Sequence, residues 1–150
     1  MNPFVISTIA VAMTSYLGSY YTRQGVNSEW YQCIKSNITP PSYVFPIVWS
    51  ILYIFIAYAF GIAIQSNNKT LIYLFIVNLI YNVFWCYLYF GKKKLGYALL
   101  IMGVLIGSVI QILRFAPNII TRLMVPYLIW LIFAACLNYD SISKETICTI

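Results

Sequence analysis

Long apolar runs alternate with short polar intervals along the whole chain. Five of these runs carry no charged residue and approach the ~20 residues that a helix needs to cross a bilayer. They occupy residues 3–22, 44–64, 70–91, 95–113 and 123–139. The pattern predicts an all-α fold, a single membrane domain over residues 1–150 built as a bundle of five transmembrane helices.

The first run could be read as a signal peptide or as a spanning helix. No Lys or Arg precedes it, and no Ala-x-Ala cleavage pattern follows it, so we expect a spanning helix. Ala10, Thr14 and Gly18 recur at every fourth position. Such a stripe of small residues predicts close approach of a neighbouring helix.

The polar interval 23–42 is much longer than the others and contains the pair Trp30 and Tyr31. A long loop between tightly connected helices favours a functional lid, although a simple connector is the alternative. We expect the other polar stretches, 65–69, 92–94, 114–122 and the tail 140–150, to lie outside the helices.

Composition agrees with a membrane location. Apolar residues make up 62% of the chain and charged residues only 8%, against about 25% in soluble domains. The net charge of +6 could suggest nucleic-acid binding, but the basic residues lie between the apolar runs. They are better explained as determinants of membrane orientation, so we expect membrane lipid and no nucleic acid as a partner.

The basic residues are distributed unequally between the two sides of a five-span protein. One side carries six of them and the other carries three; the six are Arg23, Lys35, Lys92, Lys93, Lys94 and Lys144. The positive-inside rule places the six in the cytoplasm or cytosol, with the C-terminus and the 23–42 loop, and the N-terminus outside. A bacterial inner membrane and a mitochondrial outer membrane fit this orientation equally well.

Several kinds of active site are excluded by the residue types present. The chain has no histidine and only three acidic residues, none of them inside an apolar run. A Ser-His-Asp triad, a carboxylate pair within a helix and a histidine metal site are therefore absent, and we expect no metal and no cofactor. The four cysteines, Cys33, Cys86, Cys136 and Cys148, show no Cys-x-x-Cys spacing. We interpret them as small buried thiols rather than disulfides or ligands.

Three of the predicted helices each present a face that mixes aromatic and polar residues at helical spacing. The faces are Pro46/Trp49/Tyr53, Asn78/Asn82/Trp85/Tyr89 and Pro126/Trp130/Ala134/Asn138. If they converge, they enclose a cavity suited to a flat, largely apolar ligand held by stacking and one or two hydrogen bonds. The alternative is a tightly packed bundle in which the asparagines bond helix to helix.

Gly103 and Gly107 form a GxxxG motif, and Gln111 continues the same helical face. This motif predicts close helix packing, either within the bundle or between two copies of the chain. The cholesterol-contact pattern formed by Leu137, Tyr139 and Lys144 is a weak signal that often arises by chance.

The same stretches resemble the translocator protein family, also called the tryptophan-rich sensory protein (TspO) or peripheral-type benzodiazepine receptor family. The matching motifs are WY at 30–31, PPSYVFPIVWSILY at 40–53, NVFWCYLYF at 82–90 and PYLIWLIFAACLN at 126–138. They fall in the family's order along nearly the whole chain from residue 30 to residue 138.

The resemblance implies a five-helix bundle, commonly a homodimer, with a cavity covered by the first loop. It implies that this cavity binds porphyrins such as protoporphyrin IX, and in several members sterols or benzodiazepine-type drugs. The positions that match the family's site, or that we add as plausible wall residues, are Tyr31, Trp49, Tyr53, Asn82, Trp85, Phe90, Trp130, Ala134 and Asn138.

The chain departs from the family in its first loop and its tail. After the WY pair it has Ile34-Lys35-Ser36 without the usual proline, and Ile38-Thr39 where a tryptophan is common. We therefore expect the lid to sit differently from that of relatives. The tail 140–150 lacks the family's asparagine-rich ending, which weakens any sterol role.

The sequence leaves three functional hypotheses. The leading one is a receptor or transporter-like protein that binds tetrapyrroles. The second, implied by the resemblance, is light- and oxygen-dependent porphyrin breakdown assisted by Trp49 and Trp130, the only candidates for a catalytic role. We consider an enzyme the less favoured reading because no ordinary acid or base lies inside the spans. The third is a structural or lipid-handling dimer.

Overall fold

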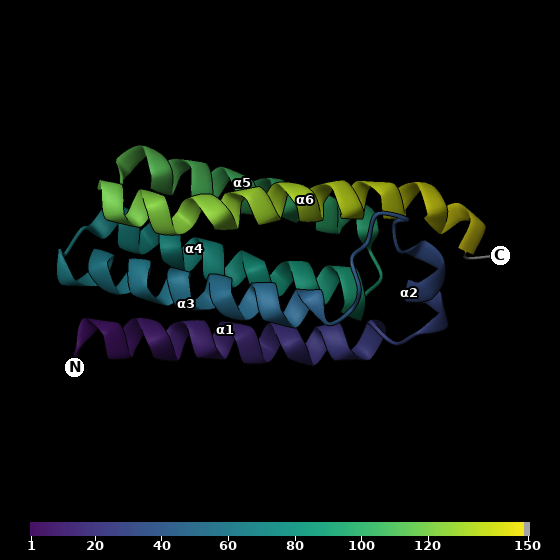
Figure 1. The fold of residues 1–150 in the computed structure, drawn as a ribbon, viewed down its shortest axis with the longest axis horizontal. Helices are drawn as coiled ribbons and strands as arrows, with labels where there is room; N and C mark the ends of the chain where they lie inside the picture. Colours follow the sequence, from purple (N-terminus) through teal and green to yellow (C-terminus); the bar gives the residue numbers. More distant parts are fainter. Residues whose placement is uncertain (149–150) are drawn as a thin grey trace.

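Five long helices lie side by side along one axis in the computed structural model, which describes residues 1–148. They are α1 (Pro3–Gly25), α3 (Val44–Gln65), α4 (Lys69–Cys86), α5 (Leu95–Phe115) and α6 (Asn118–Cys148). A π-helical turn, η1 (Tyr87–Gly91), continues α4, and a short helix, α2 (Glu29–Ile34), lies in the first loop. Figure 1 shows α2 beside the C-terminal end of α6, at the end of the bundle opposite the N-terminus.

Local sequence signals account for where several helices begin. Asn2 caps α1, because its side-chain oxygen accepts a hydrogen bond of 2.8 Å from the backbone N–H of Phe4. Ser28 caps α2 and Asn68 caps α4 in the same way, at 3.1 Å each. Pro46 lies in the first turn of α3, where a missing backbone N–H costs nothing.

The long helices close into a ring. Helix α1 contacts α3 and α4, helix α6 contacts α3 and α5, and α4 contacts α5. Large apolar side chains fill the centre, among them Ile56, Phe75 and Met124, all fully buried. In this ring α5 and α6 are the long helices that do not adjoin α1.

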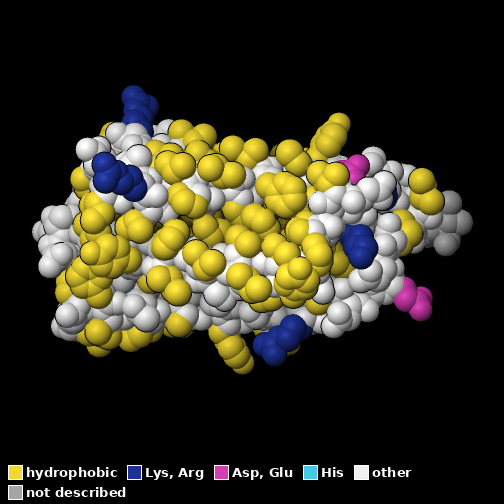
Figure 2. Space-filling view, viewed as in Figure 1, with side chains coloured by type: hydrophobic (Ala, Val, Ile, Leu, Met, Phe, Trp, Pro, Cys, Tyr) yellow, Lys and Arg dark blue, Asp and Glu magenta, His cyan; other side chains and the backbone are white. Residues whose placement is uncertain are grey.

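The outer surface of the bundle is apolar. Helices α3, α5 and α6, and α4 together with η1, are each long and apolar enough to cross a membrane. Helix α1 has 23 residues but is more polar, which we attribute to the side that it turns toward the bundle. Figure 2 shows apolar side chains along most of one face, with the acidic side chains only at the α2 end. The predicted all-α membrane fold is confirmed.

The predicted stripe of small residues on α1 is also confirmed. Thr14 and Gly18 are buried against the neighbouring helices. A Cβ atom placed on Gly18 would lie 3.4 Å from the sulfur of Cys86 in α4. Small residues at these positions therefore let α1 approach α4 closely.

The GxxxG motif does not pack within the bundle, so this one of its two predicted roles was wrong, whereas packing between two copies of the chain stays a prediction. A Cβ atom placed on Gly103 or Gly107 would meet nothing within 4 Å among the described residues. Helix α5 uses Met102, Leu105 and Val109 for its buried face instead. The two glycines therefore lie on the outer side of the ring.

The ends of the fifth long helix were predicted wrongly. The expected loop 114–122 shrinks to the two residues between α5 and α6, and the expected tail is helical as far as Cys148. Hydropathy locates the stretch of a helix that lies in the membrane, but a polar helix can continue beyond it. Pro126 lies inside α6, where it did not end the helix.

The interpretation of the cysteines as buried thiols was right only for Cys86. Cys33 and Cys148 form a disulfide, and Cys136 is an exposed free thiol. Because 115 residues separate the bonded pair, their proximity follows from the fold and could not be read from their spacing. The disulfide joins α2 to the end of α6.

Candidate functional site

A cavity of about 570 Å³ lies between α1, α3, α4 with η1, and α6, on the side of the bundle where α2 lies. Its volume falls within the range of sites that hold drug-sized organic molecules. All nine residues predicted for the site line this cavity: Tyr31, Trp49, Tyr53, Asn82, Trp85, Phe90, Trp130, Ala134 and Asn138. The convergence of the three mixed faces is therefore confirmed for these members, whereas their role in binding stays a prediction.

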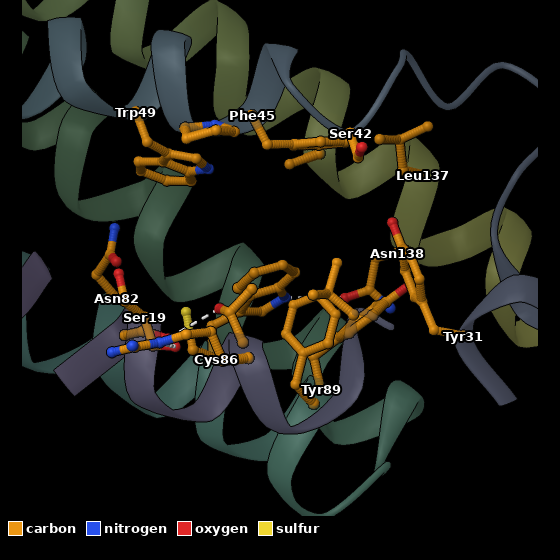
Figure 3. Close-up of a pocket in the computed structure, with 18 of the residues that line it drawn as sticks. Ser19, Tyr31, Ser42, Phe45, Trp49, Asn82, Cys86, Tyr89, Leu137 and Asn138 are labelled. Carbon is orange, nitrogen blue, oxygen red and sulfur yellow. Dashed lines mark hydrogen bonds between the residues drawn. The ribbon is translucent and has the colours of Figure 1, made fainter. Parts of the chain in front are cut away.

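Aromatic rings form two opposing walls. Figure 3 shows Trp49 and Phe45 on one side of the cavity and Cys86 and Tyr89 on the other. On the first side the rings of Trp49 and Trp130 meet at 89° with centroids 6.5 Å apart. Such an edge-to-face arrangement is favourable for indoles, and both rings line the cavity.

The second wall depends on the π-helical turn η1. In this turn the neighbouring residues Tyr89 and Phe90 are both buried, and their ring centroids are 4.7 Å apart. Trp85, one turn earlier, packs against Tyr89 at 5.1 Å. Single π-turns within α-helices are frequent at functional sites. Helical spacing alone predicted that Tyr89 points inward, but it did not predict that the next residue, Phe90, does so as well.

A chain of hydrogen bonds runs from the cavity into the core. The Tyr53 hydroxyl donates to Asn82 Oδ1 at 3.2 Å, and Asn82 Nδ2 donates to the Tyr127 hydroxyl at 3.0 Å. Tyr127 donates in turn to Asn78 Oδ1 at 2.9 Å, and Asn78 Nδ2 donates to Ser108 at 2.8 Å. Asn78 is therefore a helix-to-helix linker away from the cavity, whereas Asn82 both links helices and lines the cavity.

Asn138 orients Trp85 within the second wall. Its Oδ1 accepts a hydrogen bond from the indole Nε1–H of Trp85 at 3.0 Å, and its Nδ2 donates to the carbonyl of Leu95 at 3.0 Å. The side chain is fully buried. Because both ends of the amide are used, we assign Asn138 a positioning role in the cavity wall.

Trp130 carries a polar atom without a partner. Its indole Nε1 is the one buried side-chain nitrogen or oxygen in residues 1–148 that has no hydrogen bond. Most buried polar atoms are paired, and leaving a donor unpaired costs roughly 1–3 kcal/mol. The residue itself lines the cavity, but this nitrogen is closed off from solvent.

Sequence reasoning missed the contribution of α1 to the cavity. Ser15, Ser19 and Thr22 of this helix line it, together with Gly18. Their spacing of four and three residues places them on one face. This stripe of hydroxyl side chains was the feature of the sequence that could have predicted the contribution of α1 to the cavity. Figure 3 shows Ser19 on the same side as Cys86.

Two cations also line the cavity and were assigned only to membrane orientation. They are Arg23, near the end of α1, and Lys35, directly after α2. Both side chains are exposed, and no acidic residue is among the described residues that line the cavity. The open part of the cavity is therefore suited to an anionic group.

The first loop contributes Tyr31 to the cavity. Its ring lies 5.6 Å from that of Phe90, and burial raises the pKa of its hydroxyl above the ordinary value. The phenol is thus neutral and able to donate a hydrogen bond at physiological pH. Trp30, its neighbour, lies outside the cavity, against Tyr89 and beneath the ammonium of Lys93, at 5.2 Å from its nitrogen to the ring centroid.

The loop is anchored over the bundle. Ile34 is fully buried and belongs to a small apolar cluster with Leu95 and Ala98. The ammonium of Lys144 donates to the carbonyl of Lys35 at 3.0 Å and to Asn37 Oδ1 at 2.9 Å. These contacts place the loop where a lid would lie, but opening and closing stay a prediction.

The residues of the cholesterol-contact pattern do not form one surface. Leu137 lines the cavity and Tyr139 is 69% exposed, whereas Lys144 bonds the first loop. The geometry does not favour a shared sterol contact of the three.

Known proteins match this chain over nearly its whole length. The pattern of the TspO/MBR family matches residues 4–143. The chain belongs to the TspO/MBR family. A tryptophan-rich protein TspO from Archaeoglobus fulgidus is 30% identical over 141 residues, covering 90% of this chain and 92% of that protein. The protein CrtK of Rhodobacter capsulatus is 28% identical over 91% of this chain and 89% of its own length. The translocator protein of Ovis aries is 29% identical over 91% of this chain and 86% of its own length.

Proposed function

We propose that this TspO/MBR protein binds a tetrapyrrole such as protoporphyrin IX in the cavity between α1, α3, α4 and α6. The observation that carries the proposal is the cavity itself, walled on two sides by aromatic rings and lined by two cations. A tetrapyrrole is a flat, aromatic molecule with carboxylate side chains at one edge. Both features match the shape and the charge of the site.

In this arrangement each group has a distinct role. Trp49 and Trp130 stack on or against the macrocycle. Arg23 and Lys35 face the carboxylates. In this proposal the protein acts as a receptor or carrier: it captures and releases the ligand without changing it chemically.

Fluorescence titration with protoporphyrin IX tests the stacking role. We expect Trp49→Ala to weaken binding about tenfold, as loss of a well-placed aromatic contact does. Trp30→Phe is the matched control, because Trp30 lies outside the cavity, and it should bind as the wild type does. Equal affinity of folded Trp49→Ala and wild-type protein would remove Trp49 from the site.

Comparing the free acid with its dimethyl ester tests the charge. We expect Arg23→Gln and Lys35→Gln each to weaken binding of protoporphyrin IX by roughly two- to fivefold, the size expected of exposed ion pairs. Neither change should affect the uncharged ester. If both forms lose affinity equally, these cations do not recognise carboxylates.

The absorption spectrum of the bound porphyrin under light distinguishes simple binding from photochemical breakdown. No acidic residue is among the described residues lining the cavity, and the chain has no histidine, so acid–base catalysis lacks its usual groups. We therefore expect the bound porphyrin to keep its absorption spectrum under light in air. Light-dependent bleaching that disappears in Trp130→Phe would favour the enzymatic alternative.

A further inference from the structure

A disulfide ties the loop over the cavity to the end of the last helix. Cys33 in α2 and Cys148 in α6 are bonded, and their Cα atoms lie 5.9 Å apart. Cys33 lies between Tyr31 and Lys35, which both line the cavity. The bond therefore fixes the middle of the covering loop, and Figure 1 shows this loop and the end of α6 meeting at one end of the bundle.

The other contacts of the loop are of a kind that opens and closes without chemistry. They are the buried side chain of Ile34, the ring contacts of Trp30 and Tyr31 with η1, the ammonium of Lys93 over Trp30, and the two exposed hydrogen bonds from Lys144. All of them are non-covalent. Local opening of a surface segment held by a few such contacts is an ordinary fluctuation. The covalent bond is the contact that would restrict this fluctuation most.

We propose that the Cys33–Cys148 disulfide is a redox latch that controls access to the cavity. With the bond formed, the loop around Tyr31 stays over the cavity and exchange of its contents is slow. With the bond reduced, the loop opens more often, and entry and release are faster. The latch goes beyond ligand binding and requires no particular ligand.

The chemistry of the latch is thiol–disulfide exchange with a dithiol protein of the thioredoxin class. A thiolate of this reductant attacks the sulfur of Cys33, which is exposed, and Cys148 leaves as a thiol. The second thiol of the reductant then releases Cys33. Two electrons and two protons pass to Cys33 and Cys148, and the reductant is left as a disulfide.

The charge distribution predicts a reducing environment for this end of the molecule. Lys35 and Lys144 flank the bond, and Lys92, Lys93 and Lys94 lie in the α4–α5 connection at the same end. Such a concentration of lysines is typical of the cytoplasmic side, where thiol reductants keep most disulfides reduced. An exposed bond on that side is expected to respond to the redox state rather than to stay closed.

Reaction of Cys86 provides a test that needs no ligand. This free thiol is buried in the cavity wall, so its modification by methyl methanethiosulfonate reports opening. The protein in lipid nanodiscs is treated with or without a phosphine reductant, the phosphine is removed before the reagent is added, and the Cys86 peptide is followed by mass spectrometry. We expect modification to be at least about fivefold faster after reduction, the lower end of typical coupling between sites.

A variant without the bond is the control. Cys33→Ser should show the fast rate with and without the reductant. An unchanged Cys86 rate in wild-type protein after reduction would overturn the latch, as would absence of the Cys33–Cys148 linked peptide in oxidised protein. The wild-type comparison needs no variant, so it holds even if Cys33→Ser folds poorly.

The release rate of protoporphyrin IX, measured by stopped-flow fluorescence, extends the test to the proposed ligand. We expect release to accelerate on reduction by a similar factor. If Cys86 responds to reduction but protoporphyrin IX does not bind, the latch stands and the proposed ligand is wrong. If the porphyrin binds with unchanged release and Cys86 does not respond, the ligand stands and the latch is wrong.

Discussion

At the scale of single residues, hydrogen bonds decide which side chains of the bundle can face a ligand. Tyr127 lies at the centre of the chain that starts at the cavity: it accepts from Asn82 and donates to Asn78. It is fully buried. The chain therefore ties α3, α4 and α6 together through amide and hydroxyl groups, of which Asn78, Asn82 and Tyr127 are buried.

Removing the Tyr127 hydroxyl should destabilise the protein. In Tyr127→Phe both asparagines lose a partner inside the bundle, and each unsatisfied group costs roughly 1–3 kcal/mol. We expect a clearly lower midpoint of thermal unfolding in detergent, measured by circular dichroism. Tyr139→Phe, on the same helix but 69% exposed, is the matched control and should melt with the wild type. Equal midpoints for both variants would mean that the chain contributes nothing to stability.

The sequence predicted the residues of the cavity better than their partners. Helical spacing alone places Trp49, Asn82 and Trp130 on three faces that mix aromatic and polar groups, because residues three and four apart share a side. Spacing does not say how deep a residue lies or what it meets. Asn78 and Asn82 were therefore indistinguishable, and Tyr127 was not foreseen, since its partners come from another helix.

At the scale of helices, small residues decide which pairs can approach closely. Gly61 in α3 is buried against Phe4 of α1, and a Cβ atom placed there would overlap the phenyl ring. Gly107 in α5 has nothing within 4 Å of that position among residues 1–148. The GxxxG motif is a recognised packing signal, whereas a single glycine such as Gly61 is not. The single glycine nevertheless forms the close contact inside the bundle.

Substituting the two glycines separates these roles. Gly61→Val should push α1 away from α3 and destabilise the bundle by about 1–3 kcal/mol, as overpacking does. Gly107→Val should leave the stability of the monomer unchanged. Chemical unfolding in mixed micelles measures both. The opposite order of stabilities would mean that α1 packs on α3 less closely than described.

Helix ends were the least predictable part of the elements. The apolar pattern ended at residues 113 and 139, whereas α5 and α6 end at Phe115 and Cys148. Hydropathy reports contact with lipid, and α6 continues beyond its apolar stretch because the loop and α2 pack against it. The turn η1 had no clear sequence signal either, since a π-turn changes hydrogen bonding without changing composition.

At the scale of the whole molecule, the two ends of the bundle differ in what they carry. One end holds the first loop, the disulfide, the α4–α5 connection and the C-terminal part of α6; the other holds the N-terminus and the turn between α3 and α4. The disulfide is typical of an oxidising compartment, whereas the lysines are typical of the cytoplasmic side. A permanent disulfide would not be expected on the cytoplasmic side that the lysines indicate. A disulfide that is opened by reduction is compatible with that side.

Membrane orientation is therefore the last prediction, and it follows from charge. We expect the end that carries α2 to face the cytoplasm, because positive residues near helix ends resist transfer across the membrane. Two cysteine substitutions report the two ends, Ser66→Cys in the α3–α4 turn and Lys92→Cys after η1. Both positions are exposed.

Labelling intact cells with a membrane-impermeant maleimide, followed by peptide mapping, measures which position is outside. Ser66→Cys should be labelled in intact cells, and Lys92→Cys only after the membrane is permeabilised. The reverse pattern would place the disulfide in an external compartment. In that case Cys33–Cys148 would stay oxidised, and the loop over the cavity would be fixed rather than regulated. Orientation thus decides whether the latch can work in the cell, independently of what the cavity binds.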